Sequence, residues 1–215
     1  MNSDALLSAT DITTWRGETC VLDDVCVRVQ AGEVWQVTGP NGSGKTTLLR
    51  TLAGLALPDE GTVEWRGQPI QRVRADFQSE LLYLGHKAGI NGALTPRENL
   101  AAFLNLRQRV PDFTALDNAL SVLGLGERLD LPCRWLSAGQ QRRVTLARLL
   151  LEPASLWVLD EPLNALDADG VAWVIERIEQ QAATGGAVLF TTHQAMTFQN
   201  CVCSQLNLHN TGALG

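Results

Sequence analysis

Apolar and polar residues alternate along the first part of the chain in the pattern of β-strands. Residues 21–29 alternate strictly enough to predict a half-buried strand, and 33–39 is a short apolar strand that follows a turn at Gly32. Residues 61–67 and 81–85 predict two further strands. The first sixty residues therefore predict a region rich in β-structure.

The pattern becomes helical in two places. A glycine-rich loop is followed by an amphipathic stretch at 45–55. After His86 a longer helical region begins, and its first helix has a clear start: Thr95 as N-cap, Pro96 at the first helical position and Glu98 placed to close a capping box. Helical spacing continues in two further segments, 113–125 and 138–151.

The last part of the chain returns to alternating strands and helices. Residues 155–160 are continuously apolar, which is typical of a buried parallel strand. A helix is predicted at 170–181 and another strand at 186–193. We therefore expect an α/β core formed by residues 1–87 and 151–215, with a helical lobe, 88–150, inserted into it.

Composition narrows the function classes. The chain has 215 residues and a net charge of −6, so no broad basic surface indicates binding to nucleic acid. No apolar run reaches the ~18 residues needed to span a bilayer, and the N-terminus lacks the features of a secretory signal. Its five cysteines have no framework spacing, which suits a reducing cytoplasm. If the protein works at a membrane, a partner must hold it there.

One motif predicts phosphate binding. The segment GPNGSGKTT matches G-x-x-x-x-G-K-[ST] between a predicted strand and a predicted helix, the context that the motif requires. Its residues are Gly39, Pro40, Asn41, Gly42, Ser43, Gly44, Lys45, Thr46 and Thr47. The glycines allow backbone N–H groups to surround a phosphate, Lys45 is placed for the β- and γ-phosphates, and the Thr46 hydroxyl for Mg²⁺. The alternative, an ordinary Gly/Asn/Ser turn, does not explain this context.

Two adjacent carboxylates end the apolar strand in LWVLDEP. Asp160 is a candidate Mg²⁺ ligand, acting through water, and Glu161 a candidate general base for an attacking water. An apolar run that ends in Asp-Glu is by itself usually a strand exit. The phosphate loop earlier in the chain gives the functional interpretation its weight, because ligand groups gather at strand ends of α/β sheets.

The segment LSAGQ leads into a predicted helix. Ser137 and the backbone N–H groups around Gly139 predict a second anion-binding helix start, which includes Gln140. Alone, this pattern indicates an ordinary Ser-capped helix. Its position between the phosphate loop and the carboxylate strand favours the functional interpretation.

Together these motifs resemble the nucleotide-binding subunit of ATP-binding-cassette (ABC) transporters over essentially the whole chain. The resemblance implies a P-loop NTPase (RecA-like) α/β fold with an antiparallel β subdomain and an inserted helical subdomain, with ATP and Mg²⁺ as cofactors. It implies that residues 164–167 link two sites, that His193 contacts the γ-phosphate, and that Trp15 stacks on adenine. It also implies that LSGGQ of one subunit covers ATP bound to another, so that two copies form an ATP-sandwich dimer. Here Ala138 replaces the middle glycine, and a positive φ at that position would cost strain.

A narrower resemblance rests on the segments YLGH, LTPRENL, LSAGQQRRVTLARL, LWVLDEP and FTTHQ. They are similar to the ATP-binding subunit of the bacterial cytochrome c maturation system, the haem exporter ATPase. In the broader family, Gln is usual at the position of His86, the loop that senses γ-phosphate and touches the membrane partner. The resemblance implies integral membrane subunits as partners, a peripheral location at the cytoplasmic face of the inner membrane, and energy supply for haem export or release of a haem-loaded chaperone.

Two other functions stay open from the sequence. An ABC ATPase for another small cargo would more naturally have Gln at position 86. A nucleotide-gated soluble assembly factor would never touch a membrane. Soft-metal binding by Cys201 and Cys203 is disfavoured, because small residues that alternate along a C-terminal strand explain them more simply. Haem binding by these cysteines or His209 is disfavoured as well, because they are better explained as tail residues near a strand.

Overall fold

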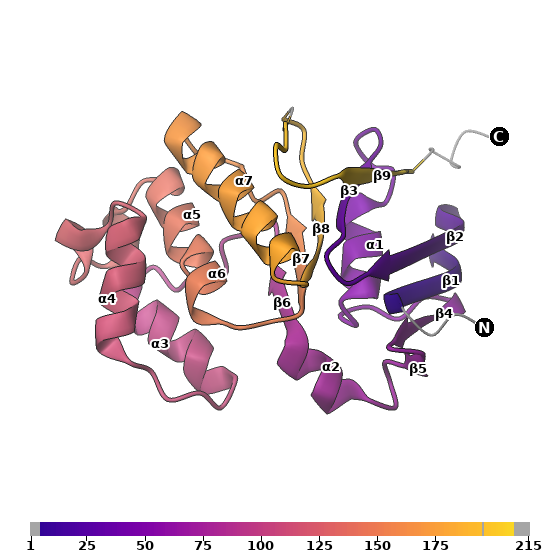
Figure 1. Cartoon of the computed structure of the whole chain (residues 1–215), viewed down its shortest axis with the longest axis horizontal. Coiled ribbons are helices and arrows are strands. Elements are labelled where there is room, and N and C mark those ends of the chain that lie inside the picture. Colours follow the sequence, from indigo (N-terminus) through magenta and orange to yellow (C-terminus); the bar gives the residue numbers. More distant parts are fainter. Residues whose placement is uncertain (1–4, 195, 209–215) are drawn as a thin grey trace. The chain divides into compact units, whose positions relative to one another are not determined.

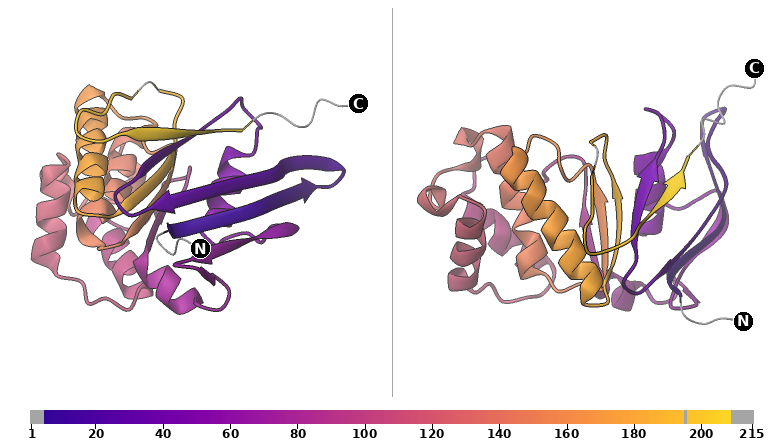
Figure 2. Two further views of the ribbon diagram at one scale, coloured as in Figure 1. Left: turned by 45° about the vertical axis from the view of Figure 1, so that its right-hand side comes forward. Right: turned by 45° about the horizontal axis from the view of Figure 1, so that its top comes forward.

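The computed structural model describes residues 5–194 and 196–208. Its N-terminal segment forms most of an antiparallel sheet. His209 lies outside the described residues. The strand order is β2-β1-β4-β5, and the two long strands β1 and β2 lie side by side in Figure 2. The strands are β1 (Ala5–Arg16), β2 (Thr19–Gln30), β4 (Glu60–Trp65) and β5 (Gln68–Pro69). This confirms the antiparallel β part of the predicted fold.

A second sheet has five strands in the order β6-β7-β8-β3-β9. Its strands are β6 (Leu81–Leu84), β7 (Leu156–Asp160), β8 (Ala187–Thr191), β3 (Val34–Thr38) and β9 (Cys203–Asn207). The pairings β7·β8, β8·β3 and β3·β9 are parallel. All residues of β7 and β8 are buried, as expected of parallel strands that are covered on both faces.

Helix α1 (Lys45–Leu52) packs against both sheets (Figure 1). It ends three residues earlier than the predicted 45–55 because Gly54 adopts a left-handed conformation, with φ of 67°. The N–H of Leu55 then donates to the carbonyl of Arg50, and the N–H of Gly54 to that of Thr51, which is the Schellman pattern of helix termination. The glycine in the sequence LAGL was the local signal for this end.

The described chain divides into two compact units. The first comprises residues up to 83, 154–161 and from 178 onward, and it contains the antiparallel sheet, α1 and α2 (Arg74–Glu80). The second comprises 84–153 and 162–177 and is helical. Helix α7 (Ala168–Ala183) contributes to both units.

The helical unit begins as the sequence predicts. Helix α3 (Pro96–Leu106) starts with the capping box: Glu98 N–H donates to Thr95 Oγ1, and Thr95 N–H donates to Glu98 Oε2. Besides part of α7, the unit contains α4 (Phe113–Val122), α5 (Ala138–Leu146) and α6 (Arg148–Leu151), with short 3₁₀ turns at Gly126–Arg128 and Cys133–Trp135. The segment 138–151, predicted as one helix, is therefore two, divided at Ala147.

A buried carboxylate holds the end of the helical unit together. The side chain of Glu152 is 0% exposed and forms ion pairs with Arg148 and, at 3.1 Å, with Arg107. The Arg148 guanidinium also lies 4.4 Å from the ring centroid of Phe103. Removing either cation would leave the buried charge of Glu152 poorly compensated, so this network stabilises the chain just before β7.

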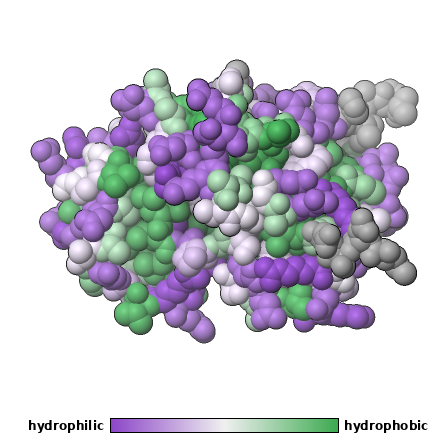
Figure 3. Space-filling model, in the orientation of Figure 1, coloured by the Kyte–Doolittle hydropathy of each residue, from purple (hydrophilic) through white to green (hydrophobic). Residues whose placement is uncertain are grey.

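The surface mixes polar and apolar side chains, with apolar ones visible over the helices α3 to α6 in Figure 3. The exposed large apolar residues of the helical unit include Leu106, Val110, Phe113, Val122 and Trp135. Within the described ranges, no helix is both long and apolar enough to cross a membrane.

Candidate functional site

The predicted phosphate loop and carboxylates meet at one edge of the parallel sheet. Val37 of β3 is level with Thr191 of β8, and Thr191 is level with Asp160 of β7. Strands β3, β7 and β8 therefore end at the same level of the sheet, to within one residue. The loop that follows β3 and the side chains that end β7 and β8 are therefore neighbours, as expected at the carboxyl edge of an α/β sheet.

The phosphate loop needs its glycines for two physical reasons. Gly39, Gly42 and Gly44 have φ of 144°, 83° and 90°, which other residues rarely adopt. A Cβ on Gly44 would lie 2.8 Å from the carbonyl oxygen of Val21, and one on Gly39 would lie 2.5 Å from that of Leu208. The loop is therefore tightly curled, and α1 begins at Lys45, within the motif.

Four polar side chains of the loop are candidates for phosphate or Mg²⁺ binding. Lys45 Nζ donates to the carbonyls of Gly39 at 2.8 Å and Pro40 at 2.9 Å. Ser43 is buried, and its Oγ makes no hydrogen bond with any described residue. Thr46 is exposed, while Thr47 is buried at the first turn of α1. The Lys45 ammonium, the hydroxyl of Ser43 and the N-terminus of α1 together suit the binding of a phosphate chain.

Thr191 organises the two carboxylates. Its Oγ1 donates to Asp160 Oδ1 at 2.8 Å and accepts from the backbone N–H of Glu161 at 3.0 Å. Glu161 adopts φ of 52°, an uncommon left-handed conformation for a non-glycine residue, which turns its side chain out of the strand direction. Sequence reasoning missed Thr191, because its role depends on the pairing of β7 with β8.

His193 lies beside Glu161. Its Nε2 is 3.4 Å from Glu161 Oε1, with side-chain exposures of 58% for the histidine and 9% for the glutamate. A nearly buried carboxylate next to an exposed imidazole can hold and pass a proton at the sheet edge. The structure thus brings together the two residues predicted to be catalytic.

Tyr83 of β6 belongs to the same neighbourhood. Burial raises the pKa of its phenol, the negative charge of Asp160 raises it further, and Arg50 lowers it. The phenol therefore stays protonated beside the carboxylate.

Trp15 is 50% exposed near the end of β1. Its backbone N–H donates to Asp59 Oδ2 at 2.6 Å, and it pairs with Cys20 across the hairpin. The indole is therefore accessible from solvent, as a residue that stacks on a planar ring must be. Its stacking on adenine stays a prediction.

The LSAGQ segment forms the start of α5. Ser137 is the N-cap: its Oγ accepts from Gln140 N–H, and its own N–H donates to Gln140 Oε1. Because Ser137 Oγ serves as the acceptor, its hydroxyl hydrogen remains available to a ligand. Ala138 is the first residue of α5 and is not among the positive-φ residues, so the strain considered for it does not arise.

The loop after β7 passes so close to position 139 that only glycine fits there. A Cβ there would lie 2.5 Å from the carbonyl oxygen of Ala165, which itself has φ of 64°. Two residues on, Asp167 binds Arg143 of α5 through both carboxylate oxygens, at 2.6 and 2.7 Å. The segment 164–167 is therefore fixed to α5 within the helical unit.

His86 is exposed in a loop whose backbone is held by α5. Buried Arg142 donates through Nη1 to the carbonyl of Gly85 at 3.1 Å and through Nε to that of Pro162 at 3.2 Å. Thr145 Oγ1 donates to the carbonyl of Ala88 at 2.8 Å. The histidine thus projects from a loop fixed on both sides, and Arg142 connects that loop to the residue that follows Glu161 in the chain.

The C-terminal cysteines do not favour metal binding. Cys203 begins β9, and Cys201 precedes it. Burial raises the pKa of Cys203 to about 11, and burial together with Glu179 raises that of Cys201. Both thiols therefore stay protonated, whereas a soft metal binds the thiolate.

The family model described as ABC transporter matches residues 22–164. The Yersinia pestis protein named cytochrome c biogenesis ATP-binding export protein CcmA is 50% identical over 189 residues, which cover 88% of this chain and 86% of that protein. The Methylococcus capsulatus protein of the same name is 45% identical over 96% of this chain and 99% of that protein. The chain belongs to the ABC transporter family, among the cytochrome c biogenesis ATP-binding export proteins.

The fold agrees with this family. A solved structure described as a putative ABC transporter (ATP-binding protein) from Pyrococcus furiosus superposes with a TM-score of 0.79 at 27% identity, covering 94% of this chain and 96% of that one. The predicted P-loop NTPase fold of an ABC ATP-binding domain is thereby confirmed. The chain is an ABC-type ATPase.

Proposed function

We propose that this ABC ATPase is the ATP-hydrolysing subunit of a transporter complex for c-type cytochrome biogenesis. It supplies energy for haem export or for release of a haem-loaded chaperone at the inner membrane. The observation that carries the proposal is the grouping of the phosphate loop, Asp160, Glu161 and His193 at one sheet edge, in a chain whose relatives are named cytochrome c biogenesis export proteins.

Each proposed site residue has a distinct role. The loop from Gly39 to Thr47 cradles the phosphates, and Lys45 leaves its carbonyl partners to neutralise the β- and γ-phosphates. Thr46 and Asp160 offer the oxygen ligands that Mg²⁺ prefers, and Mg²⁺ would neutralise phosphate charge there. Glu161 accepts a proton from the attacking water, and His193 contacts the γ-phosphate. Trp15 stacks on adenine.

The LSAGQ segment, residues 136–140, acts on a second copy of the chain. Ser137 and Gln140, with the N–H of Gly139, form a helix start suited to the phosphates of ATP bound by the partner copy. Phosphate oxygens are acceptors, and the Ser137 hydroxyl hydrogen is free to donate to them while Oγ accepts from Gln140. Two copies would thus enclose two ATP molecules as one ATPase dimer.

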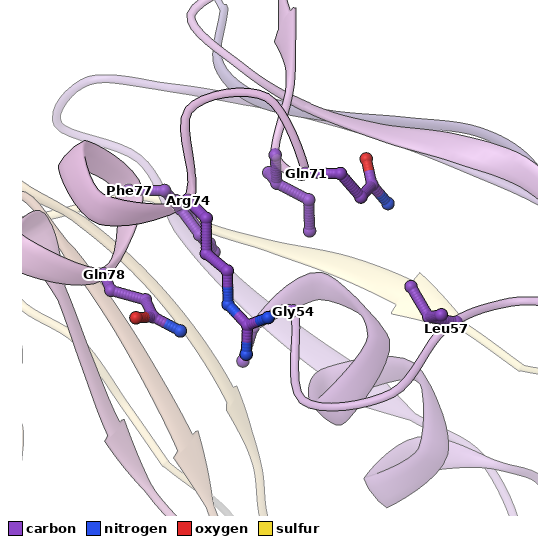
Figure 4. Close-up of a pocket in the computed structure, with 8 residues that line it drawn as sticks. Gly54, Leu57, Gln71, Arg74, Phe77 and Gln78 are labelled. Atoms are coloured by element: carbon purple, nitrogen blue, oxygen red, sulfur yellow. The ribbon is translucent and has the colours of Figure 1, made fainter.

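We further propose that the chain sits peripherally at the cytoplasmic face of the inner membrane, held by integral membrane subunits. A pocket at the end of α1 is lined by Gly54, Leu57 and Phe77, with Arg74 of α2 reaching toward Gly54 (Figure 4). Leu57 is 74% exposed. This pocket suits a cytoplasmic segment with an apolar side chain and a carboxylate for Arg74.

Two variants test the proposal, one for the ATPase role and one for the contact with the membrane subunit. Lys45→Ala should bind ATP poorly without unfolding the domain, since a phosphate-loop lysine has no role in the core. Both ATPase activity and cytochrome c maturation in cells should then fail. Normal ATP binding by this variant would remove the phosphate-loop assignment. Leu57→Asp should keep ATPase activity in the isolated chain but lose co-purification with the membrane subunit.

An alternative is an ABC ATPase for another small cargo, and a second is a soluble nucleotide-gated assembly factor. Identifying the integral membrane protein that co-purifies with the chain separates them. A cytochrome c maturation subunit supports our proposal, a different permease supports the first alternative, and no membrane protein supports the second.

A further inference from the structure

Arg16, the last residue of β1, reaches from the antiparallel sheet to the phosphate loop. Its Nη2 donates to Thr47 Oγ1 at 3.0 Å. Thr47 belongs to the first turn of α1, and Thr19 faces Arg16 across the β1–β2 hairpin. A side chain outside the phosphate-loop motif thus contacts the helix on which that motif depends.

The electrostatics of this position are unusual for an arginine. The N-terminus of a helix has partial positive charge and disfavours a nearby cation. Lys45 adds a second cation, and the first turn of α1 contains no acidic residue. Within the described part of the chain, Arg16 forms no ion pair with a carboxylate. A bound anion would relieve this accumulation of positive charge.

Arg16 also keeps donors for such an anion. A guanidinium has five N–H groups in a planar fork that matches phosphate, and the bond to Thr47 uses one of them. The Arg16 side chain is exposed, so a ligand can reach it. The hydrogen bond to Thr47 holds the group in place before the ligand arrives.

We propose that Arg16 binds the α-phosphate of the nucleotide, as a second phosphate-binding cation besides Lys45. Arg16 follows Trp15, the residue proposed to stack on adenine, whereas Lys45 serves the β- and γ-phosphates. A cation between these two lies at the phosphate nearest the nucleoside. This inference rests on the proposed ATP site and adds a binding residue to it.

The position predicts which kinetic constants change. Both ATP and ADP contain the α-phosphate, so loss of Arg16 should lower the affinity for each nucleotide by a similar factor. The factor should be about tenfold, the effect of losing one charge-assisted hydrogen bond at an exposed position. Because the α-phosphate is remote from the bond that breaks, KM should rise while kcat at saturating ATP stays the same.

Four variants test this by titration with Mg-ATP and Mg-ADP and by ATPase kinetics. Arg16→Ala removes the group, Arg16→Lys keeps the charge, and Arg16→Gln keeps an N–H donor for Thr47 without the charge. Arg72→Ala, at an exposed arginine outside the loop, is the matched control. We expect Arg16→Ala and Arg16→Gln to lose affinity for both nucleotides, Arg16→Lys to keep most of it, and the control to bind like wild type.

Three results would overturn the inference. Wild-type affinity of Arg16→Ala would show that the guanidinium does not meet the ligand. Wild-type affinity of Arg16→Gln would reduce Arg16 to a support for Thr47. A loss confined to ATP would place the cation at the γ-phosphate instead. Each of these results would leave the proposed ATP site unaffected. If the wild-type chain failed to bind Mg-ATP, both the proposed ATP site and this inference would be wrong.

Discussion

His193 Nε2 lies 3.4 Å from Glu161 Oε1, so the candidate base and the candidate γ-phosphate sensor are in contact before any ligand is considered. They come from the ends of adjacent parallel strands, β7 and β8. Thr191, the last residue of β8, accepts the N–H of Glu161 and lies two residues before His193 in the chain. The relative position of base and sensor is therefore set by strand pairing.

Glu161→Gln should slow hydrolysis while keeping Mg-ATP bound. The amide preserves the shape of the side chain and its backbone bond to Thr191, so only the ability to accept a proton is lost. We expect turnover to fall by more than about tenfold, equivalent to ~1.4 kcal/mol in the barrier. Single-turnover hydrolysis and ATP titration measure the two effects separately. Undiminished turnover would exclude Glu161 as the base.

Association in the presence of ATP tests whether two copies of the chain together form each ATP site. Glu161→Gln should be mainly monomeric without nucleotide and dimeric with ATP, because the negative phosphates complement the opposing Ser137 and helix N-terminus only in the closed pair. Light scattering at high protein concentration measures this. The double variant Lys45→Ala, Glu161→Gln is the control and should stay monomeric. If ATP induced no association of Glu161→Gln, the two-copy site would have to be abandoned.

Acidification should weaken the link between α5 and the loop after β7. The N–H of Gly170 and then the guanidinium of Arg143 hold the pKa of Asp167 below its usual range. A carboxylate with a lowered folded-state pKa stabilises the fold above its unfolded-state pKa, about 3.9, and that contribution disappears as pH falls through the folded-state value. Asp167 is 64% exposed, so the effect is small. Urea unfolding of wild type and Asp167→Asn should therefore differ near pH 7 and converge at acid pH. A constant difference would contradict this.

The sequence predicted those parts of the site that depend on local patterns. The phosphate loop, the strand ending in Asp160 and the capped start of α3 each have a signal within a few residues. Helix α2 was not predicted, because in seven residues it buries only Phe77 and so shows no amphipathic period. Thr191 and Arg16 were missed for another reason. Their partners lie 31 residues away along the chain, and only the folded sheets bring them together.

The backbone of the loop that contains His86 is anchored, so the His86 side chain can be replaced without moving the loop. Arg142 and Thr145 bind the backbone carbonyls of Gly85 and Ala88, so replacing the imidazole leaves the loop in place. Neutral imidazole offers nitrogen, whereas Mg²⁺ prefers oxygen, so a hydrogen bond through water or to a partner group suits it better than metal ligation. The simpler alternative is an exposed histidine at a strand exit with no role.

We predict that His86→Ala spares ATP binding but weakens coupling to the membrane subunit, and that His86→Gln retains much of the coupling. Glutamine preserves a polar group able to donate and accept at this position, and alanine does not. Lys87→Ala, at the exposed neighbouring residue, is the control for surface change alone. Cytochrome c maturation in cells, measured beside the ATPase activity of the purified complex, separates coupling from catalysis. Full maturation by His86→Ala would show that the histidine is only a residue at the end of a strand.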